Sequence, residues 1–410
     1  MHHYWLKVIA TSNIRNKILF YKQKILLSNE VDFMAIQLFV PTFDVDGCLA
    51  EIKECLEKGW TGLGFKTLQF EEEWKRYTGL PNAHFLNSAT SGLNIAFDIL
   101  KERYGWNDDT EVITTPLTFV SSNHAILLAG LKAVFADVDN TLCLDPNDVE
   151  KRITPNTKAI LYVGLGGNTG HYDEIVSLCE KYDLKLILDA AHMAGTRLNG
   201  EIPGKEAEVV IYSFQAVKNL PTADSGMICF KSRELDDIVR KKTWLGINKD
   251  TFARINTKGN YKWKYDVEYV GQKYHGNSIM AAIGLVQLKH LDKENSYRRQ
   301  IAEWYTKGFA SYNDKIKLIE IPQNCESSRH LFQIIVDDRD GLIEALNQEE
   351  IFPGVHYTDN TEYRMYGYAN GTCPNASYIS DHVISLPMHM RLSFDDVQTI
   401  INTILKFISK

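Results

Sequence analysis

Short apolar runs alternate with helical patterns through the first three quarters of this chain, and no other feature constrains its fold as strongly. Strand patterns lie at residues 133–137, 159–163, 185–189, 209–214 and 226–230, with helical patterns at 172–182 and 279–291. Such alternation predicts parallel strands joined by crossover helices, an arrangement that gathers ligands at the carboxyl ends of the strands. We therefore predict an α/β fold with a mostly parallel central sheet.

The pattern changes after about residue 300, where a long helix is expected to continue through Phe309. A strand pattern at 331–336, a helix around 342–346 and a closing helix at 394–408 follow. We expect a large domain at residues 34–300 and a smaller C-terminal α/β domain at 301–410. Residues 1–33 are basic and form an N-terminal extension. It is either a targeting or disordered segment, or the product of a start codon assigned upstream of a true start at Met34.

Two of the predicted strands are followed by residues that together indicate a cofactor. Lys218 comes shortly after the strand at 209–214, while Asp189 and His192 close the strand at 185–189. A lysine amine can hold the aldehyde of pyridoxal phosphate as a Schiff base, and a buried carboxylate can keep the pyridine nitrogen of that cofactor protonated. Each residue alone has an ordinary alternative, since most such lysines are solvated and a strand-terminal aspartate often caps a helix.

A third segment has the pattern of a phosphate site. Residues 84–87 have a strand pattern, Ser88–Gly92 a tight turn that contains Thr90 and Ser91, and 93–100 an amphipathic helix. Small hydroxyl residues at a helix N-terminus offer backbone N–H groups, side-chain donors and the positive end of the helix dipole. An ordinary helix cap is the alternative for this segment alone. The three segments together favour a single site for pyridoxal phosphate.

Several motifs resemble those of one known family: Asn87–Ser91, Thr115–Phe119, Asp189–His192, Ser213–Asn219 and Ala281–Leu285. They are similar to motifs of the DegT/StrS family of nucleotide-sugar aminotransferases, and the resemblance extends from about Ile36 to Ile408. Members of that family have the fold type I architecture of pyridoxal-phosphate transferases. The resemblance therefore implies a large domain with a mostly parallel central sheet and a smaller C-terminal α/β domain.

The resemblance also implies a role for most of the candidate site residues. Lys218 would form the Schiff base and then act as the base that moves a proton between substrate and cofactor. Asp189 would pair with the pyridine nitrogen, His192 would lie near the ring oxygen, and Phe119 would stack on the ring face. Gln215 would lie close to the ring edge. The phosphate would be held by Thr90, Ser91 and Ser213.

A homodimer with active sites shared between two subunits is a further implication. The segment before the 279–291 helix would reach the cofactor phosphate of the neighbouring subunit, and it has His275 where the family commonly has arginine. A histidine can still donate to phosphate, although its charge varies near neutral pH. A structural role is the alternative for His275. His356 and Tyr357 resemble a segment near the sugar pocket and are the candidate substrate residues, with a structural histidine as the alternative for His356.

The reaction implied by the resemblance moves an amino group from an amino acid, expected to be L-glutamate, to a keto group of a nucleotide-linked deoxysugar. It would run in two steps through pyridoxamine phosphate and serve surface polysaccharide or glycoconjugate biosynthesis. One alternative is a pyridoxal-phosphate sugar dehydratase, which Lys218 disfavours because those relatives typically have histidine there. The other is a non-catalytic sensor with the same fold. Residues 223–225, which depart from the family's glycine-rich loop, and His275 keep that alternative open.

Composition argues against several other classes of protein. The 410 residues are 44% hydrophobic, enough for a large core, and the formal net charge of −7 provides no basic field for nucleic acid. No apolar run approaches bilayer length, so we expect a soluble, cytoplasmic protein without membrane contact. The seven cysteines form no Cys-x-x-Cys pair, and no histidine cluster has metal-ligand spacing. Neither a disulfide framework nor a bound metal is expected.

Overall fold

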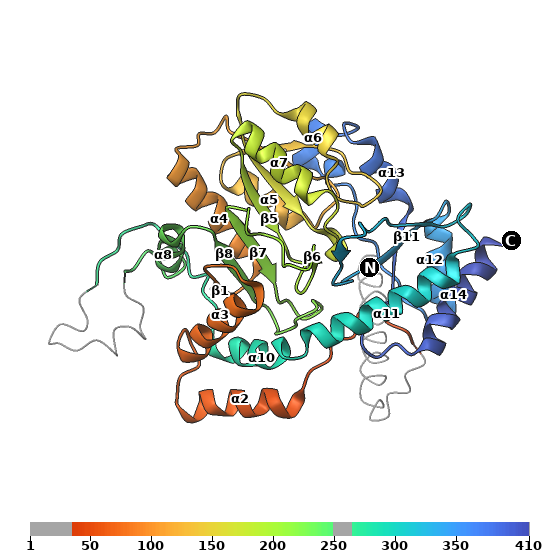
Figure 1. The fold of residues 1–410 in the computed structure, drawn as a ribbon, viewed down its shortest axis with the longest axis horizontal. Helices are drawn as coiled ribbons and strands as arrows, with labels where there is room; N and C mark the ends of the chain where they lie inside the picture. Colours follow the sequence, from red (N-terminus) through yellow and green to blue (C-terminus); the bar gives the residue numbers. More distant parts are fainter. Residues whose placement is uncertain (1–34, 249–264, 410) are drawn as a thin grey trace, which may run out of the picture. The chain divides into compact units, whose positions relative to one another are not determined.

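A seven-stranded sheet with the order β1-β8-β7-β5-β4-β2-β3 forms the centre of the fold in a computed structural model that describes residues 35–248 and 265–409 (Figure 1). Its strands are β1 (His84–Leu86), β2 (Glu111–Thr114), β3 (Lys132–Phe135), β4 (Thr157–Val163), β5 (Lys185–Asp189), β7 (Val209–Ser213) and β8 (Gly226–Phe230). Neighbours among β3, β2, β4, β5 and β7 pair in parallel, whereas β8 pairs antiparallel with both β7 and β1. The prediction of a mostly parallel sheet is confirmed.

The central strands are buried on both faces, and their side chains alternate between two hydrophobic clusters. In β5, Ile187 packs in one cluster while Leu186 and Leu188 pack in the other. The first cluster includes residues of α4 (Ala89–Tyr104), α5 (Val120–Leu128) and α8 (Arg233–Lys242). The second includes residues of α3 (Phe65–Thr78), α7 (Tyr172–Tyr182) and α10 (Ser278–Leu288). Helices on both faces explain why these strands read as near-continuous apolar runs.

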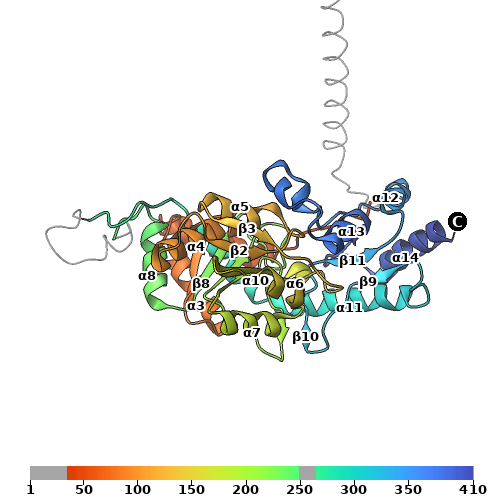
Figure 2. The same cartoon turned by 90° about the horizontal axis from the view of Figure 1, so that it is seen from above.

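A smaller antiparallel sheet follows α10, with the order β12-β11-β9. Its strands are β9 (Lys317–Leu318), β11 (Phe332–Ile335) and β12 (Val383–Leu386), and the helices of this region are α11 (Leu291–Phe309), α12 (Arg339–Gln348), α13 (Pro374–His382) and α14 (Phe394–Ile408). In both views α12, α13, α14 and β11 lie together, and Figure 1 shows α11 running towards them from α10 (Figures 1 and 2). The remaining elements are α2 (Val45–Glu57), α6 (Pro146–Arg152), β6 (Arg197–Leu198), β10 (Cys325–Glu326), η1 (Leu165–Gly167), η2 (Asn360–Glu362) and η3 (Arg364–Ala369).

Three predicted helix boundaries are wrong. The segment predicted as a tight turn at Ser88–Gly92 is the cap and first turn of α4, because Ser88 Oγ accepts a hydrogen bond from Ser91 N at 3.0 Å and starts the helix there. The helix expected at 279–291 ends at Leu288, where Lys289 N donates to Val286 O at 3.1 Å. The next helix begins at Leu291, so the long helix expected from about residue 300 starts earlier than predicted.

The expected domain boundary at residue 300 falls inside α11, and the described residues from Gln37 onwards hold together as one compact unit. The division into a large and a small domain remains a prediction. The predicted extension at residues 1–33 lies outside the described residues.

The strand directions place several loops at one edge of the central sheet. The carboxyl ends of β1, β2, β4, β5 and β7 meet there, and the amino end of the antiparallel strand β8 joins them. Loops that follow parallel strands carry ligand-binding side chains in open α/β sheets. The functional site is therefore expected at this edge of the sheet.

Candidate active site

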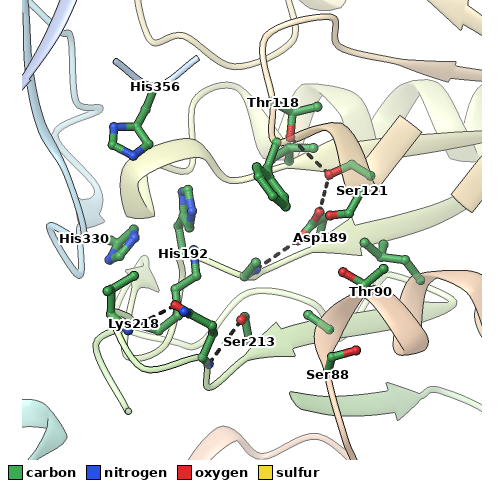
Figure 3. A pocket seen from close by; sticks show the side chains of 18 of the residues that line it. Ser88, Thr90, Thr118, Ser121, Asp189, His192, Ser213, Lys218, His330 and His356 are labelled. Atoms are coloured by element: carbon green, nitrogen blue, oxygen red, sulfur yellow. Dashed lines mark hydrogen bonds between the residues drawn. The ribbon is translucent and has the colours of Figure 1, made fainter. Parts of the chain in front are cut away.

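The loops at this edge surround a cavity of about 430 Å³ (Figure 3). Its wall contains residues from widely separated parts of the chain, from Phe39 to Tyr357. Most of the predicted site residues line it: Thr90, Phe119, Asp189, His192, Ser213, Gln215, Lys218, His356 and Tyr357. Ser91 and His275 do not belong to this wall. The structure thus brings together the segments from which a cofactor site was predicted.

Lys218 lies in the turn that follows β7. The turn is closed by two hydrogen bonds to Gln215, from Lys218 N to its carbonyl oxygen at 2.8 Å and from Val217 N to its Oε1 at 3.1 Å. Burial lowers the pKa of the Lys218 amine to about 8, and the charge of Asp189 offsets part of that effect. A larger fraction of this amine is therefore neutral near pH 7 than in an exposed lysine, as a nucleophile or base requires.

Asp189 is the last residue of β5, and its carboxylate is buried at 3% exposure. Burial raises the pKa of this carboxyl, while hydrogen bonds from Ser122 Oγ at 2.7 Å and from Ala191 N at 3.0 Å act in the opposite direction. These donors stabilise the ionised form in surroundings that would otherwise favour the acid. A buried carboxylate of this kind can pair with a cationic N–H group of a bound heteroaromatic ring.

The N-terminus of α4 reaches the cavity with small hydroxyl residues. Ser88 and Thr90 line the wall, and Ser213 at the end of β7 lies in the same wall. Ser91 is placed behind them, because its hydroxyl donates to Asn87 Oδ1 at 2.5 Å as part of the helix cap. The cavity therefore has a helix N-terminus and nearby hydroxyl groups, a combination that suits a phosphate.

Gly226, the first residue of β8, permits this arrangement. A Cβ atom at this position would lie 2.6 Å from Ala89 N and 2.8 Å from Tyr212 O, both backbone atoms. No side chain fits in that space. The glycine lets β8 begin directly against the start of α4 and keeps the Asp224–Ser225 loop at the cavity wall.

The opposite part of the wall contains three histidines and a tyrosine. His192 accepts a hydrogen bond at Nδ1 from Gly166 N at 3.2 Å, and its Nε2 lies 3.3 Å from Tyr357 Oη. Its ring centroid is 4.3 Å from that of His330, and His356 Nδ1 lies 2.9 Å from Ser385 Oγ. Burial lowers the pKa of all three imidazoles, that of His356 to about 4. They are neutral hydrogen-bonding groups at physiological pH.

Phe119 and His275 occupy contrasting positions. The Phe119 side chain is 57% exposed at the cavity, 6.0 Å from the Tyr357 ring, so its face is accessible to a flat ligand. His275 lies at the outer edge of β1, where its ring centroid is 4.6 Å from Trp244 and its Nδ1 donates to Gly276 O at 2.7 Å. The predicted contact of His275 is with a neighbouring subunit and remains a prediction.

The residues of the wall that the sequence reasoning missed include Ser122 and His330. Ser122, which holds Asp189, lies three residues beyond the Thr115–Phe119 motif, on the first turn of α5. His330 directly precedes the strand predicted at 331–336. A polar residue next to a buried strand or on the first turn of a helix is a signal, but it is common in loops that bind nothing.

A sequence model of the DegT/DnrJ/EryC1/StrS aminotransferase family matches residues 45–405. The chain belongs to this family. The predicted resemblance is thereby confirmed over most of the chain, and with it the class of enzyme.

Relatives of this DegT/DnrJ/EryC1/StrS protein include two bacterial proteins with informative names. The spore coat polysaccharide biosynthesis protein SpsC of Bacillus subtilis is 34% identical over 368 residues, which cover 87% of this chain and 93% of SpsC. The UDP-4-amino-4,6-dideoxy-N-acetyl-beta-L-altrosamine transaminase of Campylobacter jejuni is 31% identical over 377 residues, which cover 90% of this chain and 95% of that enzyme.

Solved structures of similar proteins confirm the fold. Helicobacter pylori PseC, an aminotransferase involved in the biosynthesis of pseudoaminic acid, superposes with a TM-score of 0.84 at 28% identity, covering 92% of this chain and 100% of PseC. Streptococcus pneumoniae Spr1654 in its PMP form has a TM-score of 0.82 at 28% identity, covering 89% of this chain and 97% of that one. Its PLP form has a TM-score of 0.81 at 27% identity, covering 90% and 97%.

Two further findings concern a membrane span and a metal site. Across 35–248 and 265–409, no helix combines the length and the apolar content that crossing a bilayer requires. Within the same residues, no three His, Cys, Asp or Glu side chains are grouped so as to hold a metal ion.

Proposed function

We propose that this family member binds pyridoxal phosphate and transfers an amino group from an amino acid, with L-glutamate as the expected donor, to a keto group of a nucleotide-linked deoxysugar. The product would enter surface polysaccharide or glycoconjugate biosynthesis. The observation that carries the proposal is one cavity that holds both the Lys218 amine, with a pKa of about 8, and the buried Asp189 carboxylate. Family membership and the named relatives support the same reaction class.

The residues of the cavity fit pyridoxal phosphate. Ser88, Thr90 and Ser213 would hold its phosphate at the N-terminus of α4, and Asp189 would pair with its ring nitrogen. Phe119 offers an exposed ring for stacking. When bound, the cofactor supplies an electron sink for the substrate carbon.

Lys218 has two tasks in this proposal. Its neutral amine would first bind the cofactor aldehyde, and after release it would carry a proton at Nζ between the substrate carbon and the cofactor carbon. Both tasks require an amine that loses its proton readily, and burial in the cavity wall supplies that property.

The substrates would enter on the histidine side of the cavity. His356 and Tyr357 lie on this side and offer neutral hydrogen-bonding groups to the hydroxyl and keto oxygens of a sugar. The names of the Campylobacter and Bacillus relatives support a nucleotide-linked substrate and a polysaccharide product. We also propose a homodimer in which His275 of one subunit reaches the cofactor phosphate of the other.

Replacement of Lys218 tests this function. Lys218→Ala should lower transamination by more than about a thousandfold, because no other amine among the described residues of the cavity wall can take over both tasks. Lys158→Ala is the matched control, since the Lys158 amine donates to Pro155 O at the surface, and this variant should retain full activity. Near-normal turnover of a keto sugar by Lys218→Ala would rule the proposal out.

A further inference from the structure

His330 is held in one tautomer by its surroundings. Its side chain is 3% exposed and lines the cavity, and its Nδ1 lies 3.0 Å from Asn219 Oδ1 (Figure 3). The orientation of the Asn219 amide decides which atom carries the proton. Asn219 Nδ2 lies 2.8 Å from Ser328 O, and a carbonyl oxygen can only accept, so the atom that faces it must be the amide nitrogen.

The neighbouring residues confirm this orientation. Asn219 Nδ2 also donates to Asn295 Oδ1 at 2.8 Å, and Asn295 Nδ2 donates in turn to Ala194 O at 2.8 Å. Asn219 Oδ1 must therefore accept from His330, which places the imidazole proton on Nδ1. Burial lowers the pKa of His330 well below its usual value, with the charges of His192 and Lys218 acting in the same direction. The neutral ring then has a bare lone pair on Nε2.

His192 is held in the opposite tautomer. A backbone N–H group, that of Gly166, donates to its Nδ1 at 3.2 Å, so the neutral ring carries its proton on Nε2. The protonated Nε2 lies 3.3 Å from Tyr357 Oη. The third histidine, His356, pairs with a hydroxyl that can donate or accept, which leaves its tautomer open. Of the three imidazoles in the described cavity wall, His330 is the one whose hydrogen bonds require an unprotonated nitrogen that no donor occupies.

Lys218 is the neighbouring group that can use this acceptor. It immediately precedes Asn219 in the chain and lies at the same end of the cavity as His330 (Figure 3). In the structure the Lys218 amine lies within hydrogen-bond distance of no acceptor among the described residues, His330 Nε2 included. An amine that attacks a carbon or accepts a proton must direct its lone pair at that carbon, and an acceptor for one of its N–H bonds restricts its rotation.

We propose that the Lys218 side chain turns so that Nζ donates a hydrogen bond to His330 Nε2, which thereby orients the amine, and that Asn219 maintains the tautomer that makes this possible. His330 and Asn219 are thus positioning residues that act through Lys218. No proton is transferred between Lys218 Nζ and His330 Nε2 in this contact. The inference deepens the proposed function and depends on it for its catalytic meaning, but the contact itself can be measured without any cofactor.

Two substitutions at His330 distinguish the hydrogen bond that its ring donates to Asn219 from the one that it accepts from Lys218. His330→Gln can place an amide oxygen near the position of Nε2 and so keep the acceptor, but it loses the donor to Asn219. His330→Asn keeps a donor near Asn219 and loses the acceptor. If His330 acts as an acceptor, His330→Gln should retain more activity than His330→Asn. If its role is purely structural, His330→Asn should retain more.

The first readout is the titration of Lys218 in protein prepared without cofactor, measured as the rate of acylation of this amine against pH. A hydrogen bond to the ammonium favours the charged form, so loss of the acceptor in His330→Asn should lower the apparent pKa of Lys218 by about one unit. In His330→Gln the pKa should stay near that of the native protein. Equal values in the native protein and His330→Asn would overturn the inference.

The second readout is the rate of the half-reaction with the amino donor in single-turnover experiments. We expect a decrease of about tenfold or more in His330→Asn and a smaller one in His330→Gln. The reverse order would overturn the inference and leave the proposed function intact. Absence of any half-reaction in the native protein would instead contradict the proposed function, while the lysine titration would still test the contact.

A third measurement does not depend on the folding of a His330 variant. Native protein labelled with nitrogen-15 in histidine should show a neutral imidazole protonated at Nδ1, whose Nε2 signal shifts in Lys218→Ala. Absence of such a histidine, or an Nε2 signal that ignores Lys218→Ala, would contradict the inference.

Discussion

Asp189 and Lys218 lie in the wall of the same cavity, yet burial helps one of them and hinders the other. Burial favours the neutral amine that Lys218 needs, but it also favours the protonated acid at Asp189, where the proposed function needs a carboxylate. Ser122 Oγ and Ala191 N counter this by donating to the two carboxylate oxygens. The charge state of Asp189 therefore depends on Ser122, whose hydroxyl donates to the carboxylate.

Ser122→Ala tests that dependence. Loss of a hydrogen bond to a charged group costs about 1.5–3 kcal/mol, so pyridoxal phosphate should bind at least about tenfold more weakly. Its dissociation constant can be measured by fluorescence titration. Ser177→Ala is the control, because the Ser177 hydroxyl donates to Asp173 O on the exposed side of α7 and should leave the affinity unchanged. Equal affinity in Ser122→Ala and the control would contradict this role.

Residues whose type carries the chemistry could be predicted from the sequence, and residues that act through others could not. Lys218 and Asp189 follow strands and bear the groups that a cofactor needs. Ser122 and His330 bear ordinary groups, and their importance arises from which atom faces them in three dimensions. Thr90 and Ser91 stood in one motif, but the cap geometry turns only Thr90 to the cavity wall.

At the scale of elements, α4 can present its N-terminus to the cavity because β8 begins close to it. Gly226→Ala would place a Cβ atom 2.6 Å from Ala89 N, and backbone on both sides leaves no room for adjustment. We expect a loss of about 2 kcal/mol in the free energy of unfolding, measured by urea denaturation. Gly367→Ala is the control, because nothing lies within 4 Å of its added Cβ atom. Equal stability of the two variants would contradict the close approach.

A buried ionic network joins three other elements. Glu71 of α3 pairs with Arg240 of α8 at 2.8 Å and with His84 of β1 at 2.9 Å. Burial would raise the pKa of Glu71, but Arg240 and His84 outweigh it and lower the pKa to about 2. Because the folded-state pKa lies below the ordinary value of 4.5, the stabilisation is complete above pH 4.5 and is lost as the pH falls towards 2.

Glu71→Gln should therefore destabilise the protein most near neutral pH, by about 3 kcal/mol, because it removes one of the two buried carboxylates that pair with Arg240, the other being Asp236. The difference from native protein should shrink between pH 4.5 and pH 2, the interval bounded by the two pKa values of Glu71. Urea denaturation at several pH values measures it. Glu73→Gln removes an exposed pair with Arg76 and should cost less than about 1 kcal/mol. A difference that does not change with pH would exclude this account of the network.

Elements of the sheet could be predicted more reliably than the ends of helices. The apolar runs of β4, β5, β7 and β8 identify strands because both faces are buried. The start of α4 and the break between α10 and α11 depend on local hydrogen bonds at Ser88 and Lys289, which hydrophobic periodicity does not register. The antiparallel direction of β8 likewise follows from tertiary pairing with β1 and β7.

At the scale of the whole molecule, the proposed shared site predicts complementation between two defective chains. Lys218→Ala lacks the amine, and His275→Glu would repel the phosphate of the neighbouring subunit. Each homodimer should be nearly inactive. Coexpression of the two chains should restore about a quarter of the native activity, because half of the dimers are mixed and each mixed dimer has one intact site. No recovery in purified mixed dimers would show that His275 serves its own chain or none.

The most direct test of the central claim is the visible absorption spectrum of the purified protein with pyridoxal phosphate, recorded before and after L-glutamate is added. The account predicts a yellow complex that forms through Lys218 and bleaches with L-glutamate in the native protein, whereas Lys218→Ala forms no such complex. A yellow complex that no amino acid bleaches would contradict transamination and favour a dehydratase or a sensor. Absence of any complex in the native protein would contradict the cofactor assignment itself.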